Sequence, residues 1–177
     1  SRSQDDRWTE AALNVALVSL VLFTGLIFTF SAAVMPNLAG ADDLTFVTTL
    51  QRYNDNPVFP ITFTVVLFTT AAAAFMQRRN GRNDAVRGTV VALVLSAVVM
   101  AITAGLHIPL NMEIDEVTNL GSAAELADVR DRVEGPWVWG NIARTLLSTA
   151  AVAALGRAIF LQGRREGGRA ADGMAGR

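Results

Sequence analysis

The sequence contains a few residues with chemical potential inside long stretches that are otherwise apolar. His107 is the only histidine, and its imidazole titrates near neutral pH and could act as a general base. Arg144 lies in another apolar stretch, and its guanidinium offers several fixed donors for an anion or oxyanion. Asn111 follows His107, and Asn141 shares a helical face with Arg144. Because ionisable groups are costly inside a membrane, these positions are candidates for a functional site.

Both ionisable residues also have a structural interpretation. His107 could be a hydrogen-bonded histidine without a chemical role. Arg144 could snorkel to the lipid headgroups, or it could pair with Glu113 and Asp115, which lie just beyond the preceding apolar stretch. Asn141 on the same face favours a buried polar network over snorkelling.

The sequence contains few residues that could bind a metal ion or a haem. The chain has no cysteine, which excludes disulfides, iron–sulfur clusters and thiolate metal sites. A haem or copper site at His107 stays an alternative, because Met35, Met100 and Met112 could supply thioether ligands to copper(I). Interior methionine more often fills space, so we predict no cofactor and no metal.

Further polar and aromatic residues fall at the same ends of the apolar stretches. Met100, Thr103 and His107 recur at helical spacing, and Trp137 lies on the Arg144 face. A polar run at 51–57 precedes another apolar stretch. We expect one pocket at this end, with these candidate substrate-binding residues: Trp137, Met100, Thr103, Met35, Gln51, Tyr53 and Asn54.

The distribution of charge indicates which elements position these residues. Of the 177 residues, 51% are apolar and only 18% are charged, against about 25% in soluble domains. The charge-free stretches are long enough to cross a hydrocarbon core about 30 Å thick. We predict an all-α, integral membrane four-helix bundle as a single domain at 1–162, with spans at about 12–35, 58–77, 87–109 and 138–161. The net charge of −1 gives no sign of the basic surface that a nucleic-acid-binding protein carries, so we expect no nucleic acid partner. We expect the lipid bilayer to surround the spans.

The arginines predict the direction of the spans. They crowd into the 77–87 connection and both chain ends, whereas carboxylates outnumber them in the 110–136 connection. By the positive-inside rule both termini are cytoplasmic, and the pocket faces the outer side. All 15 basic residues are arginine, a compositional bias typical of a GC-rich genome. We expect an integral protein of a bacterial inner membrane.

The connection at 36–57 carries signals for a short amphipathic helix. Asp42 or Asp43 can cap it, and it should end before Asn56-Pro57. Such a helix could cover the outer end of the bundle as a lid, or the segment could be an ordinary surface loop.

The connection at 110–136 carries similar signals. Ser122 and Glu125 read as a capping box, followed by a stripe of Leu126, Val129 and Val133. Gly135-Pro136 is expected to break this helix before the last span. Beyond that span, the segment at 163–177 is rich in glycine and arginine, and we predict a disordered cytoplasmic tail.

Small residues recur at four-residue spacing in the third span. Such rows allow helices to approach closely, either inside the bundle or along the seam of a homo-oligomer. The two rows are Gly88, Ala92 and Ser96, and Ala97, Ala101 and Gly105.

Four short motifs occur in order along the chain. They are Val34-Met35-Pro36 after the first span, Leu50-Gln51-x-Tyr53-Asn54 with Asn56-Pro57 before the second, His107-Ile-Pro-Leu-Asn111 ending the third, and Trp137-x-Trp139-x-Asn141-x-x-Arg144 opening the fourth. In their order and spacing they resemble the anthrone-oxygenase-like family of small four-span membrane proteins.

The resemblance implies a membrane-embedded oxidoreductase, a cofactor-independent monooxygenase acting on a lipophilic aromatic or quinone-like substrate such as an anthrone. It implies deprotonation of an activated carbon acid, followed by reaction of the carbanion with oxygen. His107 would be the base, and Arg144, Asn111 and Asn141 would stabilise the oxyanion. The alternatives are a non-catalytic ligand-binding or accessory subunit of a larger membrane complex, and a small homo-oligomeric transporter.

Overall fold

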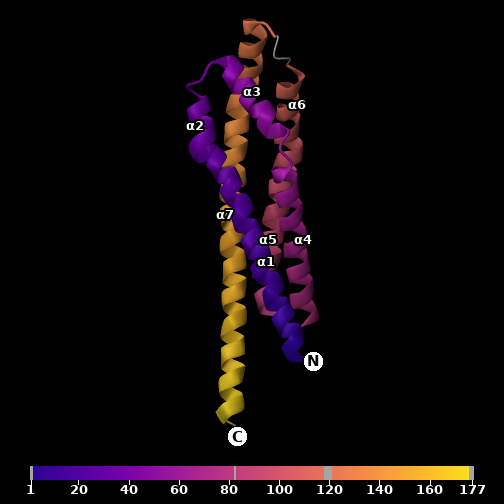
Figure 1. Cartoon of the computed structure of the whole chain (residues 1–177). Helices are drawn as coiled ribbons and strands as arrows, with labels where there is room; N and C mark the ends of the chain where they lie inside the picture. Colours follow the sequence, from indigo (N-terminus) through magenta and orange to yellow (C-terminus); the bar gives the residue numbers. More distant parts are fainter. Residues whose placement is uncertain (1, 82, 118–120, 176–177) are drawn as a thin grey trace.

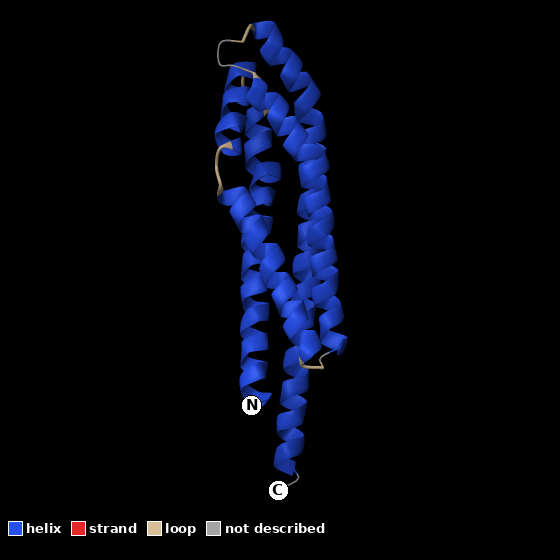
Figure 2. Cartoon of the chain, turned by 90° about the vertical axis from the view of Figure 1, so that its right-hand side faces the viewer, coloured by secondary structure: helices blue, strands red, loops and turns tan. Residues whose placement is uncertain are grey.

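The computed structural model describes residues 2–81, 83–117 and 121–175, and this part of the chain consists of helices and short connections (Figure 2). Helices long and apolar enough to cross a membrane occupy Gln4–Leu38, Val58–Arg79, Ala85–Glu116 and Ala123–Arg164. They run side by side, and both chain ends lie at the same end of the bundle (Figure 1). The predicted all-α fold with four candidate spans is confirmed.

The helical elements follow one another with few residues between them. Two of them, η1 and η2, are single π-helical turns. In chain order the elements are α1 (Arg2–Thr29), η1 (Phe30–Val34), α2 (Met35–Leu38), α3 (Asp43–Asn54), α4 (Val58–Arg79), α5 (Asn83–Ile102), η2 (Thr103–His107), α6 (Ile108–Glu116) and α7 (Ala123–Ala175).

A proline follows each π-helical turn after one intervening residue. Pro36 and Pro109 are both the second residue of the helix that follows the turn. A proline has no N–H for the carbonyl four residues earlier, and its ring clashes with that carbonyl. The helix widens here, and the N–H groups of Met35 and Ile108 reach back five residues instead of four. Both spans therefore continue past their prolines.

The last helix is longer than the sequence predicts. Gly135-Pro136 is expected to break it, but α7 continues through Pro136. A proline inside a helix costs on the order of 3 kcal/mol, and Val133 and Trp137, buried on either side, hold both halves against the bundle. The predicted break is wrong because this packing outweighs the proline. In the described chain α7 ends at Ala175.

The helix signals in the two connections are confirmed. The Asp42 carboxylate accepts a hydrogen bond from the Thr45 backbone N–H at the start of α3, which ends at Asn54. Ser122 and Glu125 form the reciprocal capping box at the start of α7. Helix α3 packs against α6 and α7 at the end of the bundle opposite the chain termini, which we call the α3 end (Figure 1).

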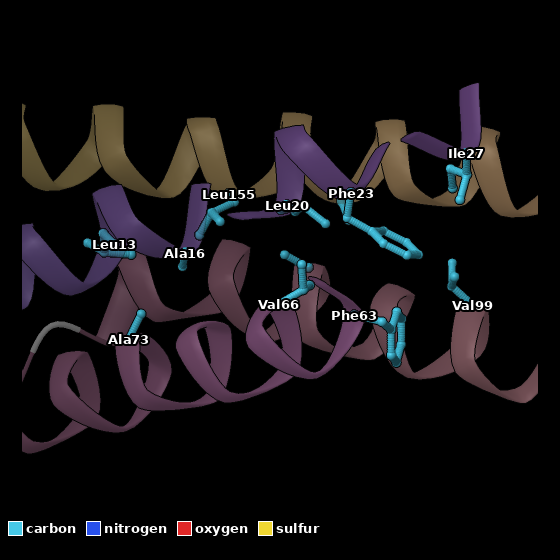
Figure 3. Packing of buried hydrophobic residues seen from close by; sticks show 12 residues of the cluster. Leu13, Ala16, Leu20, Phe23, Ile27, Phe63, Val66, Ala73, Val99 and Leu155 are labelled. Carbon is cyan, nitrogen blue, oxygen red and sulfur yellow. The ribbon is translucent and has the colours of Figure 1, made fainter. Parts of the chain in front are cut away.

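The buried side chains form two clusters along the bundle. The first runs between the spans and contains Leu20, Val66 and Leu155 (Figure 3). The second lies at the α3 end and contains the predicted stripe of Leu126, Val129 and Val133. The second cluster fixes α3 over the spans, which gives that end of the bundle a cover.

The two predicted rows of small residues face different surroundings. A Cβ on Gly88 would lie 2.7 Å from the Ala154 carbonyl oxygen, so glycine there permits the close approach of α5 and α7. Ala97, Ala101 and Gly105 are exposed on the outside of the bundle. The first row therefore packs inside the bundle, and an oligomer seam along the second stays a prediction.

Candidate functional site

A cavity of about 370 Å³ lies between the spans at the α3 end. Its walls are mostly apolar and aromatic, and its volume falls within the range of small-molecule pockets. The lining residues are Phe23, Ile27, Phe30, Leu50, Tyr53, Asn54, Asn56, Phe59, Pro60, Phe63, Thr64, Met100, Thr103, His107, Ile108, Asn111, Trp137, Asn141 and Arg144.

Uncharged neighbours hold the buried guanidinium of Arg144. Its Nη2 donates to Asn141 Oδ1 at 2.7 Å, and its Nη1 donates to Thr103 Oγ1 at 3.2 Å. Asn141 in turn donates through Nδ2 to the Ile27 carbonyl oxygen and to Ser31 Oγ, both at 2.8 Å. This network ties α7 to α1 and to both π-helical turns.

No carboxylate of a described residue forms an ion pair with Arg144. Glu113 pairs with Arg132 at 3.3 Å, and Asp115 accepts a hydrogen bond from Asn54 Nδ2 at 2.9 Å. The predicted pairing of Arg144 with these carboxylates is wrong. Helix α6 continues the span past η2, so Glu113 and Asp115 lie about 9 Å or more along the helix from the end of η2. A buried cation without a counter-charge is costly, so the cavity favours a ligand group with negative charge.

Two residues of α7 pack against the ring of His107. The ring is buried and lies edge-on to Trp137, with centroids 5.1 Å apart. It also lies against Gly140, where a Cβ would be only 2.7 Å from His107 Cε1. Trp137 itself donates through Nε1 to Asn111 Oδ1 at 2.9 Å. Both nitrogens of His107 are buried, and neither makes a hydrogen bond of normal geometry within the described chain.

Phe30 on η1 organises the aromatic wall of the cavity. Its ring lies edge-on to Tyr53 at 4.8 Å and to Phe59 at 5.5 Å, and it is tilted against Trp137 at 5.5 Å. Such contacts are favourable beyond the area that they bury. The sequence reasoning missed Phe30, because a phenylalanine within a span looks like any other lipid-facing or packing residue. Pro36 was the available signal, since it imposes the π-helical turn that carries Phe30.

The structure brings most of the predicted site residues together. The cavity is lined by the candidate catalytic residues His107, Asn111, Asn141 and Arg144 and by the candidate binding residues Trp137, Met100, Thr103, Tyr53 and Asn54.

Two predicted binding residues lie outside the lining. Met35 is buried in the second cluster of apolar side chains, directly before Pro36 in α2. Gln51 donates through Nε2 to the carbonyl oxygens of Ile114 and Val117 at 2.8 and 2.7 Å. Gln51 thus joins α3 to the end of α6.

Comparison with known proteins adds one finding about ancestry. The family model described as anthrone oxygenase matches residues 48–154, which is more than half of the chain. The matched segment contains all four candidate catalytic residues and leaves out α1 and η1. No curated protein and no solved structure matches the chain.

Proposed function

Because the chain belongs to the anthrone oxygenase family, we propose that its cavity binds a lipophilic aromatic or quinone-like substrate and that the protein oxidises this substrate with molecular oxygen. The observation that carries the proposal is a largely apolar cavity of about 370 Å³ whose polar groups include a buried guanidinium without a carboxylate partner in the described chain. A planar ring system suits the aromatic walls, and an oxyanion on that ring suits the guanidinium.

The substrate class that best uses these groups is an anthrone. Its CH₂ group is acidic, because the resulting anion is delocalised onto the carbonyl oxygen across the ring system. Once a base removes one proton, the carbanion carbon transfers electrons to O₂ and forms a C–O bond, which gives a hydroperoxide after protonation. Loss of the second proton from that carbon, with cleavage of the O–O bond, gives the quinone carbonyl and water. All electrons that reduce O₂ come from the substrate carbon, so we propose no bound cofactor.

The contacts of each residue support distinct roles. We assign His107 as the base, because it lines the cavity and its ring nitrogens make no hydrogen bond of normal geometry within the described chain. Arg144 would stabilise the oxyanion, together with the amide nitrogen of Asn111, whose oxygen already accepts from Trp137. Asn141 donates to two groups of the first span and accepts from Arg144, so we propose it as a positioning residue for the guanidinium.

We also propose that the site lies in the outer layer of a bacterial inner membrane. Both chain ends and the last turn of α4, which carries Arg78 and Arg79, lie at the end of the bundle opposite α3 (Figure 1). Under the positive-inside rule, that end is cytoplasmic.

Turnover of an anthrone tests the proposed function. The purified protein in lipid nanodiscs is mixed with an anthrone in aerated buffer, and anthraquinone formation and O₂ uptake are followed together. We expect a rate above the protein-free background, lost in His107→Ala and in Arg144→Gln. Arg157→Gln removes an exposed arginine from the same helix and should keep the wild-type rate. A wild-type rate equal to the background would contradict the proposal.

A ligand-binding protein or accessory subunit without catalysis is the second candidate. A catalytic base is usually oriented by a hydrogen bond from a third group. Among the described residues, His107 has no such hydrogen bond of normal geometry, and this observation favours the second candidate. Binding of an anthraquinone without turnover of the anthrone would support this candidate over the first.

A further inference from the structure

The walls of the cavity differ in exposure, and the difference indicates how a ligand reaches it. The lining residues on α1 and α7, among them Phe23 and Arg144, are buried. In contrast, Pro60 and Thr64 on α4 and Ile108 at the start of α6 are exposed, Ile108 by 49%, and so are Tyr53 and Asn56 near the end of α3. The exposed residues of α4 and α6 mark a sideways mouth of the cavity, formed by Pro60, Thr64 and Ile108, and Tyr53 and Asn56 mark its edge toward α3.

The surroundings of this mouth are apolar. Ile61 and Val65 are exposed beside it on α4, and Met112 is exposed on α6. Thr64 lies about 9 Å along α4 from its first residue, Val58, which places the mouth within the spanning part of the helix. In a bilayer the mouth would thus face lipid chains.

The water-facing side of the cavity is closed by hydrogen bonds from α3. Gln51 donates to the carbonyl oxygens of Ile114 and Val117. Asn54 donates to Asp115 Oδ1 at 2.9 Å and to the Asn111 carbonyl oxygen at 3.4 Å. These bonds join α3 to α6 and make a roof over the cavity.

We propose that the ligand enters the cavity from the lipid layer at the α3 end, through the mouth between α4 and α6, and that Thr64 and Ile108 limit the size of the ring system that passes. The inference rests on the proposed function, because it takes a lipophilic aromatic ligand that partitions into the bilayer. It also gives the polar residues of α3 a role: Gln51 and Asn54 hold the roof that separates the ligand from water.

Single cysteines can test this route, because the chain has no cysteine of its own. Thr64→Cys and Ile108→Cys are each made in a Trp8→Phe, Trp139→Phe background, where Trp137 is the remaining tryptophan and 9,10-anthraquinone is the quenching probe. Each variant, in lipid nanodiscs, is modified with benzyl methanethiosulfonate, and the association rate is measured by stopped-flow fluorescence.

Two further positions serve as matched controls. Ile61→Cys is exposed on α4 but lies outside the lining of the cavity. Asp55→Cys lies in the exposed connection between α3 and α4, outside the lining of the cavity, and reports on access past the roof.

We expect modification at position 64 or 108 to slow association by about tenfold, which corresponds to a barrier higher by ~1.4 kcal/mol. Reduction of the mixed disulfide should restore the rate, and modification at positions 61 and 55 should leave it unchanged. Unchanged rates after modification at both mouth positions would overturn the proposal, and so would a larger slowing at position 55. If the unmodified protein shows no quenching of Trp137 by the probe, the proposed function fails and the access route fails with it.

Discussion

Replacement of Gly140 by alanine should disturb the site through the ring of His107. The new methyl group would lie 2.5 Å from Leu106 Cδ2 and 2.7 Å from His107 Cε1. Carbon atoms in favourable contact are about 3.5–4.0 Å apart, so each neighbour must retreat by roughly 1 Å. The Leu106 side chain can rotate, but the buried His107 ring also packs edge-on against Trp137, which limits its movement. The ring must therefore shift within the cavity.

The free energy of unfolding should register two opposing effects. Overpacking of a buried position costs about 1–3 kcal/mol, whereas alanine in place of glycine within a helix gains about 1 kcal/mol. Gly156→Ala is the matched control, because it lies on the same helix and a Cβ there would meet no atom within 4 Å. We expect Gly156→Ala to stabilise the protein by about 1 kcal/mol and Gly140→Ala to destabilise it by about 0–2 kcal/mol.

Thermal unfolding and ligand binding together check this prediction. At about 2–4 °C per kcal/mol for a chain of this size, the two variants should differ in Tm by several degrees. Gly140→Ala should also bind 9,10-anthraquinone more weakly, since a misplacement of about 1 Å in a site is costly. Equal Tm values for the two variants, together with wild-type affinity in Gly140→Ala, would refute the packing argument.

Three further predictions concern charged residues. Arg144→Gln should weaken binding of an anionic hydroxyanthraquinone by about tenfold or more while neutral 9,10-anthraquinone is little affected, as measured by Trp137 quenching. Arg130→Ala should lower the free energy of unfolding by about 1–3 kcal/mol, because Arg130 donates to carbonyl oxygens at the α2–α3 connection. Arg132→Ala removes an exposed ion pair and should change the free energy of unfolding by less than about 1 kcal/mol. Denaturation experiments measure both values. Hydrogen bonds from Thr45 hold the pKa of Asp42 below its usual value of 3.8, so the cap of α3 is present above about pH 4 and is lost as the pH falls through the lowered pKa. Asp42→Asn keeps an acceptor at every pH, and parallel Tm profiles of wild type and this variant would contradict the assignment.

The spans and most of the site could be predicted from the sequence for one physical reason. A membrane excludes charge and unsatisfied polar groups, so the few that remain inside apolar stretches stand out. His107, Asn141 and Arg144 were found in this way, and the structure places all three at one cavity. The helix caps were equally readable, because a cap depends on neighbours in the chain, as at Asp42.

Features that depend on contacts between distant segments could not be predicted. The partners of Arg144 depend on the depth at which α6 places its carboxylates, and that depth cannot be read from spacing alone. Gly140 has meaning only because the ring of His107 lies against it. Gln51 looked like a ligand-binding residue because it is polar, but the amide satisfies two carbonyl groups at the end of α6 instead.

The two prolines have a local effect on the backbone, and both affect the same site. Pro36 and Pro109 each remove a backbone donor, and the preceding turn widens in response. The widened turns carry Phe30 and His107, and both rings meet Trp137, at 5.5 and 5.1 Å. One aromatic side chain on α7 therefore contacts the irregular turn of two different spans. Regular helices alone would place side chains at fixed angular steps, so the prolines give this end of the bundle a geometry that apolar periodicity does not specify.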